Sequence, residues 1–98
     1  MNQAIETAPE ITKAPQPLLA GPLGPWAVVV HNDNINTFNF VILCLQQIAR
    51  LETGIAIAKT NEIHHDGASS VTHTHREHAE LIRDRLKSRG LTVTIEPA

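Results

Sequence analysis

The chain contains the stretch Trp26-Ala-Val-Val-Val-His-Asn-Asp-Asn34, followed directly by Ile35-Asn-Thr-Phe-Asn-Phe-Val41. Its β-branched run favours a strand, and the uninterrupted apolar character is typical of a central strand that is covered on at least one face. The run ends in polar side chains at Asn32, Asp33 and Asn34, just before a helix-start signal. Amide and carboxylate groups therefore gather where a strand passes into a helix, and such a junction can bind a small charged group.

Two helices are expected after this junction. The side chain of Asn36 can cap the first helix by accepting a hydrogen bond from a free N–H group, and an apolar stripe starting at Phe38 extends that helix to about Arg50. A second helix is expected over residues 53–64. The turn signal that follows ends in Gly67, which can take a positive φ.

The rest of the chain predicts a strand, a helix and a strand. Residues 69–73 alternate weakly, and Thr74 with Glu77 forms a capping-box pattern for a third helix that should end at Gly90. Residues 91–96 alternate cleanly between apolar and polar side chains, as a half-buried strand does. The expected order is β-α-α-β-α-β, an α+β fold and open α/β sandwich in which three helices pack on a three-stranded antiparallel sheet.

Composition limits the function classes that fit. Ninety-eight residues allow one domain, and residues 1–25 hold five of the six prolines, which predicts a disordered Pro-rich N-terminal tail ahead of a core domain over 26–98. A formal charge of −2 without a Lys/Arg cluster disfavours a nucleic-acid partner. No apolar run reaches the roughly 20 residues that span a bilayer, so we expect no membrane association and a cytoplasmic location. The single Cys44 is expected to pack in the core.

The polar junction and the residues around it resemble the ClpS family, adaptors that carry N-degron substrates to Clp-type AAA+ unfoldases. In that family an apolar strand runs into an Asn-Asp-Asp-like loop and a Thr-Pro-Met-Glu-Phe-Val-like helix start, and a His follows on the next helix. The register continues without a gap from about Ala27 to about Arg89 and resumes after a shortened turn at Leu91, so the resemblance covers nearly all of the chain after residue 25. The matching residues are Asn32, Asp33, Asn34, residues 36–41 and His64.

The resemblance implies an amine-binding site. A free α-amino group is a cation with three N–H donors, so a protein that recognises it needs inward-pointing acceptors and ideally one carboxylate. By resemblance, Asn32 and His64 bind the α-amine of the substrate's first residue, and Asp33 assists, partly through water. A neutral His64 would be an acceptor, so binding should weaken as the imidazole protonates. The alternative is that Asn32 and Asp33 close a turn and His64 caps a helix; the gapless spacing to His64 favours the amine site.

The resemblance also implies a neighbouring pocket for a large apolar first side chain. Phe38 stands where a flexible Met usually gates this pocket, and Thr60 replaces a second Met. Phe is bulkier and stiffer than Met, and Thr adds a hydroxyl, so both departures bear on pocket shape and specificity. Phe38 fits a plain core aromatic equally well. The positions that correspond to the lining are Asn36, Phe38, Val41, Thr60, Ile63 and Leu91.

The family docks on its unfoldase, of ClpA or ClpC type, partly through the start of the third helix. Glu77 keeps an acidic residue there, whereas Ile82 stands where a Lys would contribute. Glu77 could instead serve only as the capping-box partner of Thr74. The tail over residues 1–25 matches the delivery tail of the family only in its expected disorder.

Five histidines crowd into residues 64–78, and the resemblance does not explain them. His75 and His78 are one helical turn apart, a spacing that can place both imidazoles on one metal ion. No Cys or tight carboxylate set completes a tetrahedral site, so dispersed surface histidines are the preferred interpretation and no cofactor is predicted. His75 and His78 are the candidate ligands if a metal binds.

The leading hypothesis is a small monomeric N-recognin of the N-end rule type, which binds substrates with a bulky apolar first residue and passes them to a Clp unfoldase-protease. Asp33 and His64 could be drawn as a catalytic base and its orienter, but no nucleophile has a recognisable setting and no Gly-rich phosphate loop occurs, so we predict no enzyme. The first alternative is a diverged protein-interaction domain of the same fold that has lost amine recognition or unfoldase docking. The second is a His-based metal-binding domain.

Overall fold

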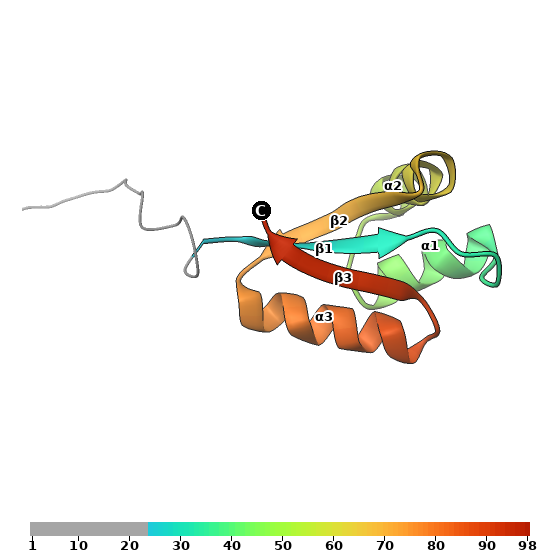
Figure 1. Ribbon diagram of the computed structural model, residues 1–98. Helices are drawn as coiled ribbons and strands as arrows, with labels where there is room; N and C mark the ends of the chain where they lie inside the picture. The colour runs from blue at the N-terminus through green and yellow to red at the C-terminus, as the bar shows by residue number, and fades with distance from the viewer. Residues whose placement is uncertain (1–23) are drawn as a thin grey trace, which may run out of the picture.

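The β-branched run that precedes the polar junction forms the middle strand of an antiparallel sheet. In the computed structural model, which describes residues 24–98, this strand is β1, and the element order β-α-α-β-α-β is the predicted one (Figure 1). Residues 1–23 of the predicted tail lie outside the described residues. The elements are β1 (Trp26–His31), α1 (Phe38–Gln47), α2 (Thr53–Asp66), β2 (Ala68–Thr74), α3 (Arg76–Ser88) and β3 (Thr92–Pro97).

The sheet has the strand order β2-β1-β3, and both pairs are antiparallel. Val30 lies opposite Ser69 on one side and opposite Val93 on the other. Side chains alternate between the two faces along a strand, so Val28 and Val30 point the same way, and both are completely buried. The predicted central strand is therefore confirmed, and its alternate residues form the floor of the core.

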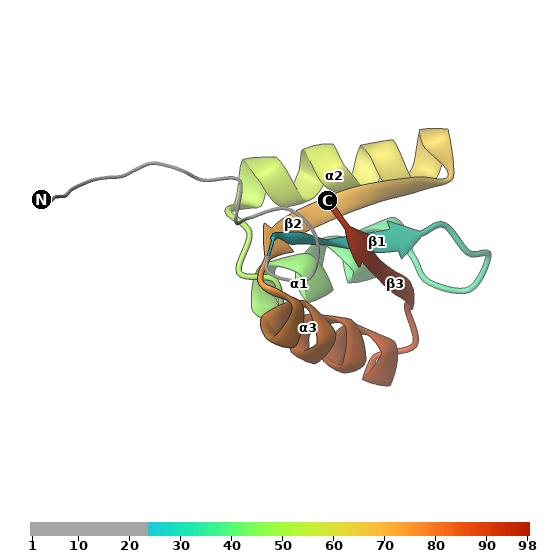
Figure 2. The same ribbon diagram turned by 60° about the vertical axis from the view of Figure 1, so that its left-hand side comes forward.

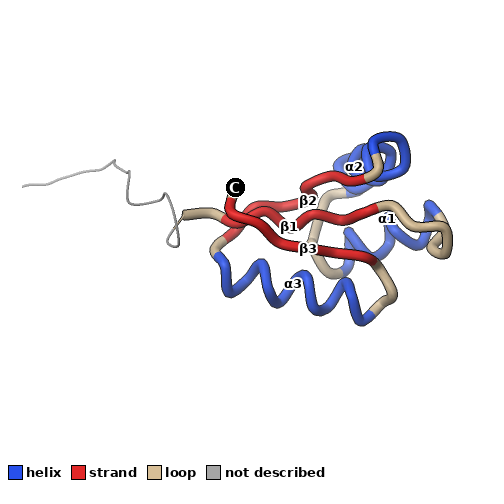
Figure 3. The backbone as a smooth tube through the Cα atoms, in the orientation of Figure 1, coloured by secondary structure: helices blue, strands red, loops and turns tan. Residues whose placement is uncertain are grey.

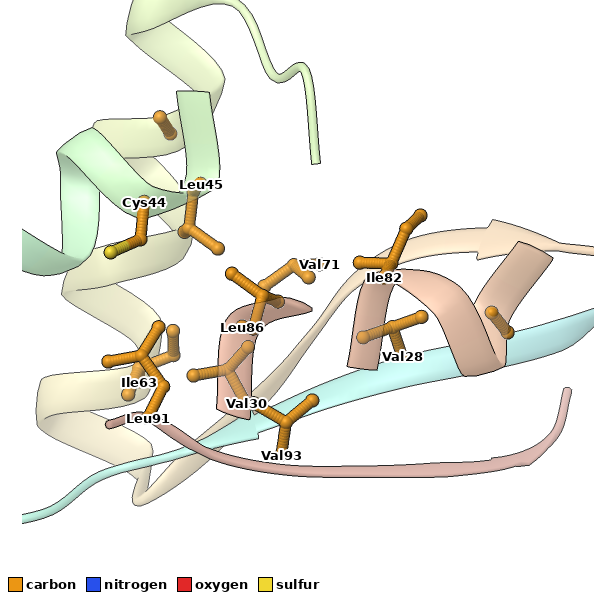
Figure 4. Close-up of a cluster of buried hydrophobic side chains, with 12 residues drawn as sticks. Val28, Val30, Cys44, Leu45, Ile63, Val71, Ile82, Leu86, Leu91 and Val93 are labelled. Carbon is orange, nitrogen blue, oxygen red and sulfur yellow. The ribbon is translucent and has the colours of Figure 1, made fainter. Parts of the chain in front are cut away.

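The three helices cover one face of this sheet. α2 runs alongside β2 and α3 alongside β3, with α1 between the two helices (Figures 1 and 2). The outward residues of β3, Thr92, Thr94 and Glu96, stay exposed, as their alternation with apolar residues predicted. The core between the helices and the sheet is drawn in Figure 4. Its largest helical side chains are Leu45, Ile63, Ile82 and Leu86.

Cys44 lies in this core on α1, as predicted, and none of its surface is exposed. Burial raises the pKa of the thiol because it disfavours the thiolate, and Arg89 offsets part of that effect. The residue therefore behaves as a small apolar side chain. Within residues 24–98, every helix is too short or too polar to traverse a lipid bilayer.

The ends of α1 and α2 differ from the predicted ones. Thr37, not Asn36, is the N-cap of α1, and its hydroxyl accepts a hydrogen bond from the amide of Phe40 at 3.1 Å. The helix ends at Gln47, before the predicted Arg50. α2 continues past residue 64 to Asp66, because the helix ends only where Gly67 takes a φ of +90° and its amide bonds the carbonyl of Ile63.

The start of α3 also differs. The predicted capping box is wrong: His75 is the N-cap residue, and its side chain makes no capping hydrogen bond. β2 is longer than expected and includes Thr74, so this residue pairs with Trp26 in the sheet and its hydroxyl is hydrogen-bonded to His78 Nδ1 at 3.2 Å. The other end was predicted well, since Gly90 follows the helix with a φ of +92°.

Candidate functional site

A cavity of about 290 Å³ opens where β1 ends, at the junction singled out in the sequence. The loop before α1 forms one side, the first turn of α1 another, and the second half of α2 the third. Polar side chains from the loop thus face apolar side chains from the two helices. The lining residues are Asn32, Asp33, Asn34, Asn36, Phe38, Val41, Thr60, Ile63 and His64.

Asp33 organises the loop. Its Oδ1 accepts hydrogen bonds from the amides of Ile35 at 2.9 Å and Asn36 at 2.8 Å, and its Oδ2 accepts one from Asn36 Nδ2 at 2.8 Å. The bonds from Asn36 and Ile35 lower the pKa of Asp33, because they stabilise the carboxylate. The side chain therefore closes a turn and stays charged beside the cavity. Its contribution to stability is present at neutral pH and is lost as the pH falls through the lowered pKa.

Asn32 lies in the loop after β1 and His64 at the end of α2, and one backbone hydrogen bond joins these two segments. The amide of Asn32 donates to the carbonyl of Gly67 at 2.8 Å, and Gly67 follows the last turn of α2, which carries His64. Both side chains are exposed. Gly67 rather than His64 is the C-cap of α2, so the imidazole of His64 is not used as a helix cap. Two acceptors and a carboxylate thus border one hollow.

Phe38 borders the cavity and is not a core aromatic. It is the first residue of α1, 39% of its surface is exposed, and its ring meets the ring of His64 edge-on, with centroids 6.3 Å apart. Val41 lies one turn further along α1 and is half-buried. The two side chains form an apolar wall that begins beside the imidazole.

Thr60 brings less polarity to the cavity than its side chain suggests. The residue is almost completely buried, and its hydroxyl donates to the carbonyl of Ala56 at 2.7 Å. A hydroxyl bonded to the preceding helical turn no longer needs a partner from the cavity. Thr60 and the buried Ile63 therefore contribute a mainly apolar, β-branched surface to the α2 side of the cavity.

Leu91 was predicted to line the pocket, but it is not among the residues that line the cavity. Its side chain is buried in the core cluster with Val93 and Leu86 (Figure 4). Its amide donates to the carbonyl of Leu86 at 3.3 Å, which closes the end of α3 and brings Leu91 into the core. Asn34, in contrast, lines the cavity although the predicted site did not include it; its place in the polar junction was the available signal.

The start of α3 lies at the opposite end of the sheet from the loop before α1 (Figure 1). A separate hollow is found along the first turns of α3. Glu77 is exposed there, while Ile82 on the same helix faces the core. The rings of His75 and His78 lie edge-on with centroids 5.8 Å apart. Among residues 24–98, no three His, Cys, Asp or Glu side chains are grouped to hold a metal ion. The hollow is lined by His75, Glu77, His78, Glu80, Leu81 and Asp84.

Comparison with known proteins identifies what this arrangement is similar to. The family model described as "ATP-dependent Clp protease adaptor protein ClpS" matches residues 22–94. The ClpS adapter protein of Synechococcus sp. (strain CC9902) is 37% identical over 73 residues, which cover 74% of this chain and 70% of that one. The ClpS adapter protein of Thermosynechococcus vestitus is 36% identical over 74 residues, covering 74% and 79%.

A solved structure has the same fold. Agrobacterium tumefaciens ClpS2, bound to L-phenylalaninamide, superposes with a TM-score of 0.72 and covers 76% of this chain and 96% of that one. The sequence identity is 22%, so this likeness concerns the arrangement of helices and strands.

Proposed function

Because the chain belongs to the ClpS family of ATP-dependent Clp protease adaptor proteins, we propose that it binds the free N-terminus of N-degron substrates and hands them to a Clp unfoldase. The observation that carries this proposal is the cavity at the end of β1. There Asn32, Asp33 and His64 border the same hollow as Phe38 and Val41. A binding module, not an enzyme, is the class that this site supports.

The polar side of the cavity suits an α-ammonium group. The group donates three hydrogen bonds, and the side-chain oxygen of Asn32 and a neutral imidazole at His64 can accept two of them. The ionised Asp33 adds a negative charge nearby, directly or through water. An N-acetyl group removes the positive charge and two of the donors, so acetylated termini should not bind.

The apolar side suits a large apolar first side chain. Phe38, Val41 and Ile63 supply hydrophobic surface, and Thr60 adds little polarity because its hydroxyl is bonded to Ala56. The L-phenylalaninamide bound to the A. tumefaciens ClpS2 has a free amine and an aromatic side chain, which is the same combination. We therefore propose bulky apolar residues such as Leu, Phe, Trp and Tyr as the first residue of the substrate.

Fluorescence anisotropy with labelled peptides tests the proposal. Peptides that begin with Leu, Phe, Trp or Tyr should bind, and their N-acetylated forms should bind at least about 100-fold more weakly, because each lost hydrogen bond to a charged group costs about 1.5–3 kcal/mol. A Met-initial peptide of otherwise identical sequence serves as the specificity control. Equal affinity for free and acetylated peptides would refute amine recognition and would favour a diverged interaction domain of the same fold.

Docking to the unfoldase is proposed to use the start of α3, where Glu77 is exposed beside the second hollow. Replacing Glu77 with alanine should weaken association with a ClpA- or ClpC-type unfoldase several-fold in a pull-down with purified proteins, because an acidic contact is lost, and should leave peptide binding unchanged. Glu96→Ala, an exposed acid on β3, is the matched control. Unfoldase association that survives Glu77→Ala would rule out this docking surface.

The remaining proposals follow from this function. The core domain over residues 26–98 carries both hollows, and we propose that it works as a monomer, because the residues proposed for amine binding and for docking all belong to one chain. Because the proposed partner is a Clp unfoldase, we also propose a cytoplasmic location for this protein. A single sedimentation species at the monomer mass, with and without peptide, is the expected result, and a dimer would contradict it.

A further inference from the structure

We propose that Asn36 is a positioning residue, which holds the Asp33 carboxylate in place for the substrate amine and ties the loop before α1 to the turn that follows α3. This inference rests on the proposed function, because it concerns the same amine site. The resemblance assigned Asn36 to the wall of the apolar pocket. Its hydrogen bonds point to a different role.

The orientation of the Asn36 side chain is determined by its partners. Nδ2 donates to Asp33 Oδ2 at 2.8 Å and to the carbonyl oxygen of Gly90 at 3.0 Å. Both partners can only accept, because the Asp33 carboxylate is ionised and the Gly90 group is a carbonyl. The amide nitrogen must therefore face them, and both of its N–H groups are used. If the side-chain oxygen of Asn36 stood there instead, it would face the Asp33 carboxylate and the Gly90 carbonyl with no hydrogen between them.

The bond to Gly90 is a tertiary contact across the end of the sheet. The loop after β1, the turn after α2 and the turn after α3 all lie at this end (Figure 3). The carbonyl of Gly67 accepts from the amide of Asn32, and the carbonyl of Gly90 accepts from the side chain of Asn36. Both glycines have a positive φ; Gly67 is the C-cap of α2, and Gly90 follows Arg89, the C-cap of α3. The loop is thus held at its two ends by the two helix-ending turns.

These contacts act on the amine side of the cavity. With Asn36→Ala, Asp33 keeps its two backbone donors at Oδ1, but Oδ2 loses its only donor among the described residues. The far end of the loop also loses its link to Gly90. The carboxylate is then free to turn away from the amine, whereas Phe38, Val41 and Ile63 stay on their helices. The expected defect is therefore in recognition of the charge.

A double-mutant cycle tests this role. Full-length wild-type, Asn36→Ala, Asp33→Ala and the double variant are compared for anisotropy binding of a Leu-initial peptide with a free amine. We expect Asn36→Ala to weaken binding about tenfold, at the lower end of the range for one hydrogen bond to a charged group, and to cause a clearly smaller further loss in the Asp33→Ala background, where only the link to Gly90 is left to remove. Asn39→Ala, an exposed asparagine on α1 outside the cavity, should bind like wild-type.

A second measurement does not require peptide or an Asp33 variant. Carboxyl ¹³C titration by NMR should give a higher pKa for Asp33 in Asn36→Ala than in wild-type, because one of the hydrogen bonds that lower this pKa is removed. If Asn36 only lined the pocket wall, the pKa of Asp33 would be the same in Asn36→Ala as in wild-type.

The outcomes separate this inference from the function on which it rests. If the wild-type protein binds the peptide but the losses of the two single variants are additive, the role of Asn36 is overturned and the adaptor function stands. The same holds if the pKa of Asp33 is unchanged in Asn36→Ala. Wild-type protein that binds no free-amine peptide would overturn both. Coupled losses together with a raised Asp33 pKa would support the inference.

Discussion

Replacing His64 with alanine is expected to weaken binding of free-amine peptides about 100-fold, because a hydrogen bond to a charged group contributes up to about 3 kcal/mol. The imidazole is exposed on the last turn of α2 and lines the cavity beside Asn32. Its removal leaves no buried hole, and alanine is a good helix former, so the fold should be unaffected. Asn32→Ala should behave similarly, since its backbone bond to Gly67 is retained.

The adjacent histidine provides a matched control. His65 is exposed on the same helical turn, with its ring centroid 5.4 Å from that of His64, but it does not line the cavity. His65→Ala should change peptide affinity by less than about twofold, as expected for a surface substitution away from the site. Thermal unfolding followed by circular dichroism should give equal midpoints for both variants. Unchanged affinity in His64→Ala or Asn32→Ala would remove that residue from the amine site.

The largest effect on stability is expected from Leu86→Ala. None of the Leu86 surface is exposed, and the side chain fills the space between α3 and the sheet together with Val93 and Ile82 (Figure 4). Removal of a buried leucine side chain costs its transfer free energy and leaves a cavity, about 3 kcal/mol in total. For a domain of this size, that is a large part of the free energy of unfolding.

Urea unfolding at equilibrium measures this difference. Leu81→Ala is the control, because Leu81 lies on the same helix but is 45% exposed, so its loss should cost about 1 kcal/mol or less. Equal losses of stability in the two variants would contradict the packing of α3 on the sheet. Peptide affinity should be unchanged in Leu81→Ala, since this residue lies away from the amine site.

Several features of the fold were predictable from short stretches of sequence. The β-branched run around Val28 and Val30 predicted the central strand, and the alternation of residues 91–96 predicted a half-buried strand, which the structure places at an edge of the sheet. Gly90 marked the end of α3, and Gly67 takes the predicted positive φ, a conformation that glycine adopts easily, although α2 extends two residues beyond its predicted end. The membership of the chain in the ClpS family agrees with the resemblance seen in the polar junction.

Other features depended on groups that are distant in the sequence. The capping box was predicted at Thr74 and Glu77, but pairing of Thr74 with Trp26 in the sheet removes that residue from the helix. Phe38 fitted a core aromatic as well as a cavity wall, and only the position of α2 beside α1 puts its ring against His64. Leu91 resembled a pocket residue but is drawn into the core by the turn after α3.

There is a physical reason why some features could be predicted from the sequence and others could not. Periodicity and glycine conformation are set by neighbours within a few residues, so the sequence was sufficient for the order of strands and helices and for the polar character of the junction. The role of a polar side chain depends on which donors and acceptors the fold brings to it. Asn36 could have capped α1, but the folded chain places Asp33 and Gly90 within reach of its amide, and Thr37 becomes the cap instead.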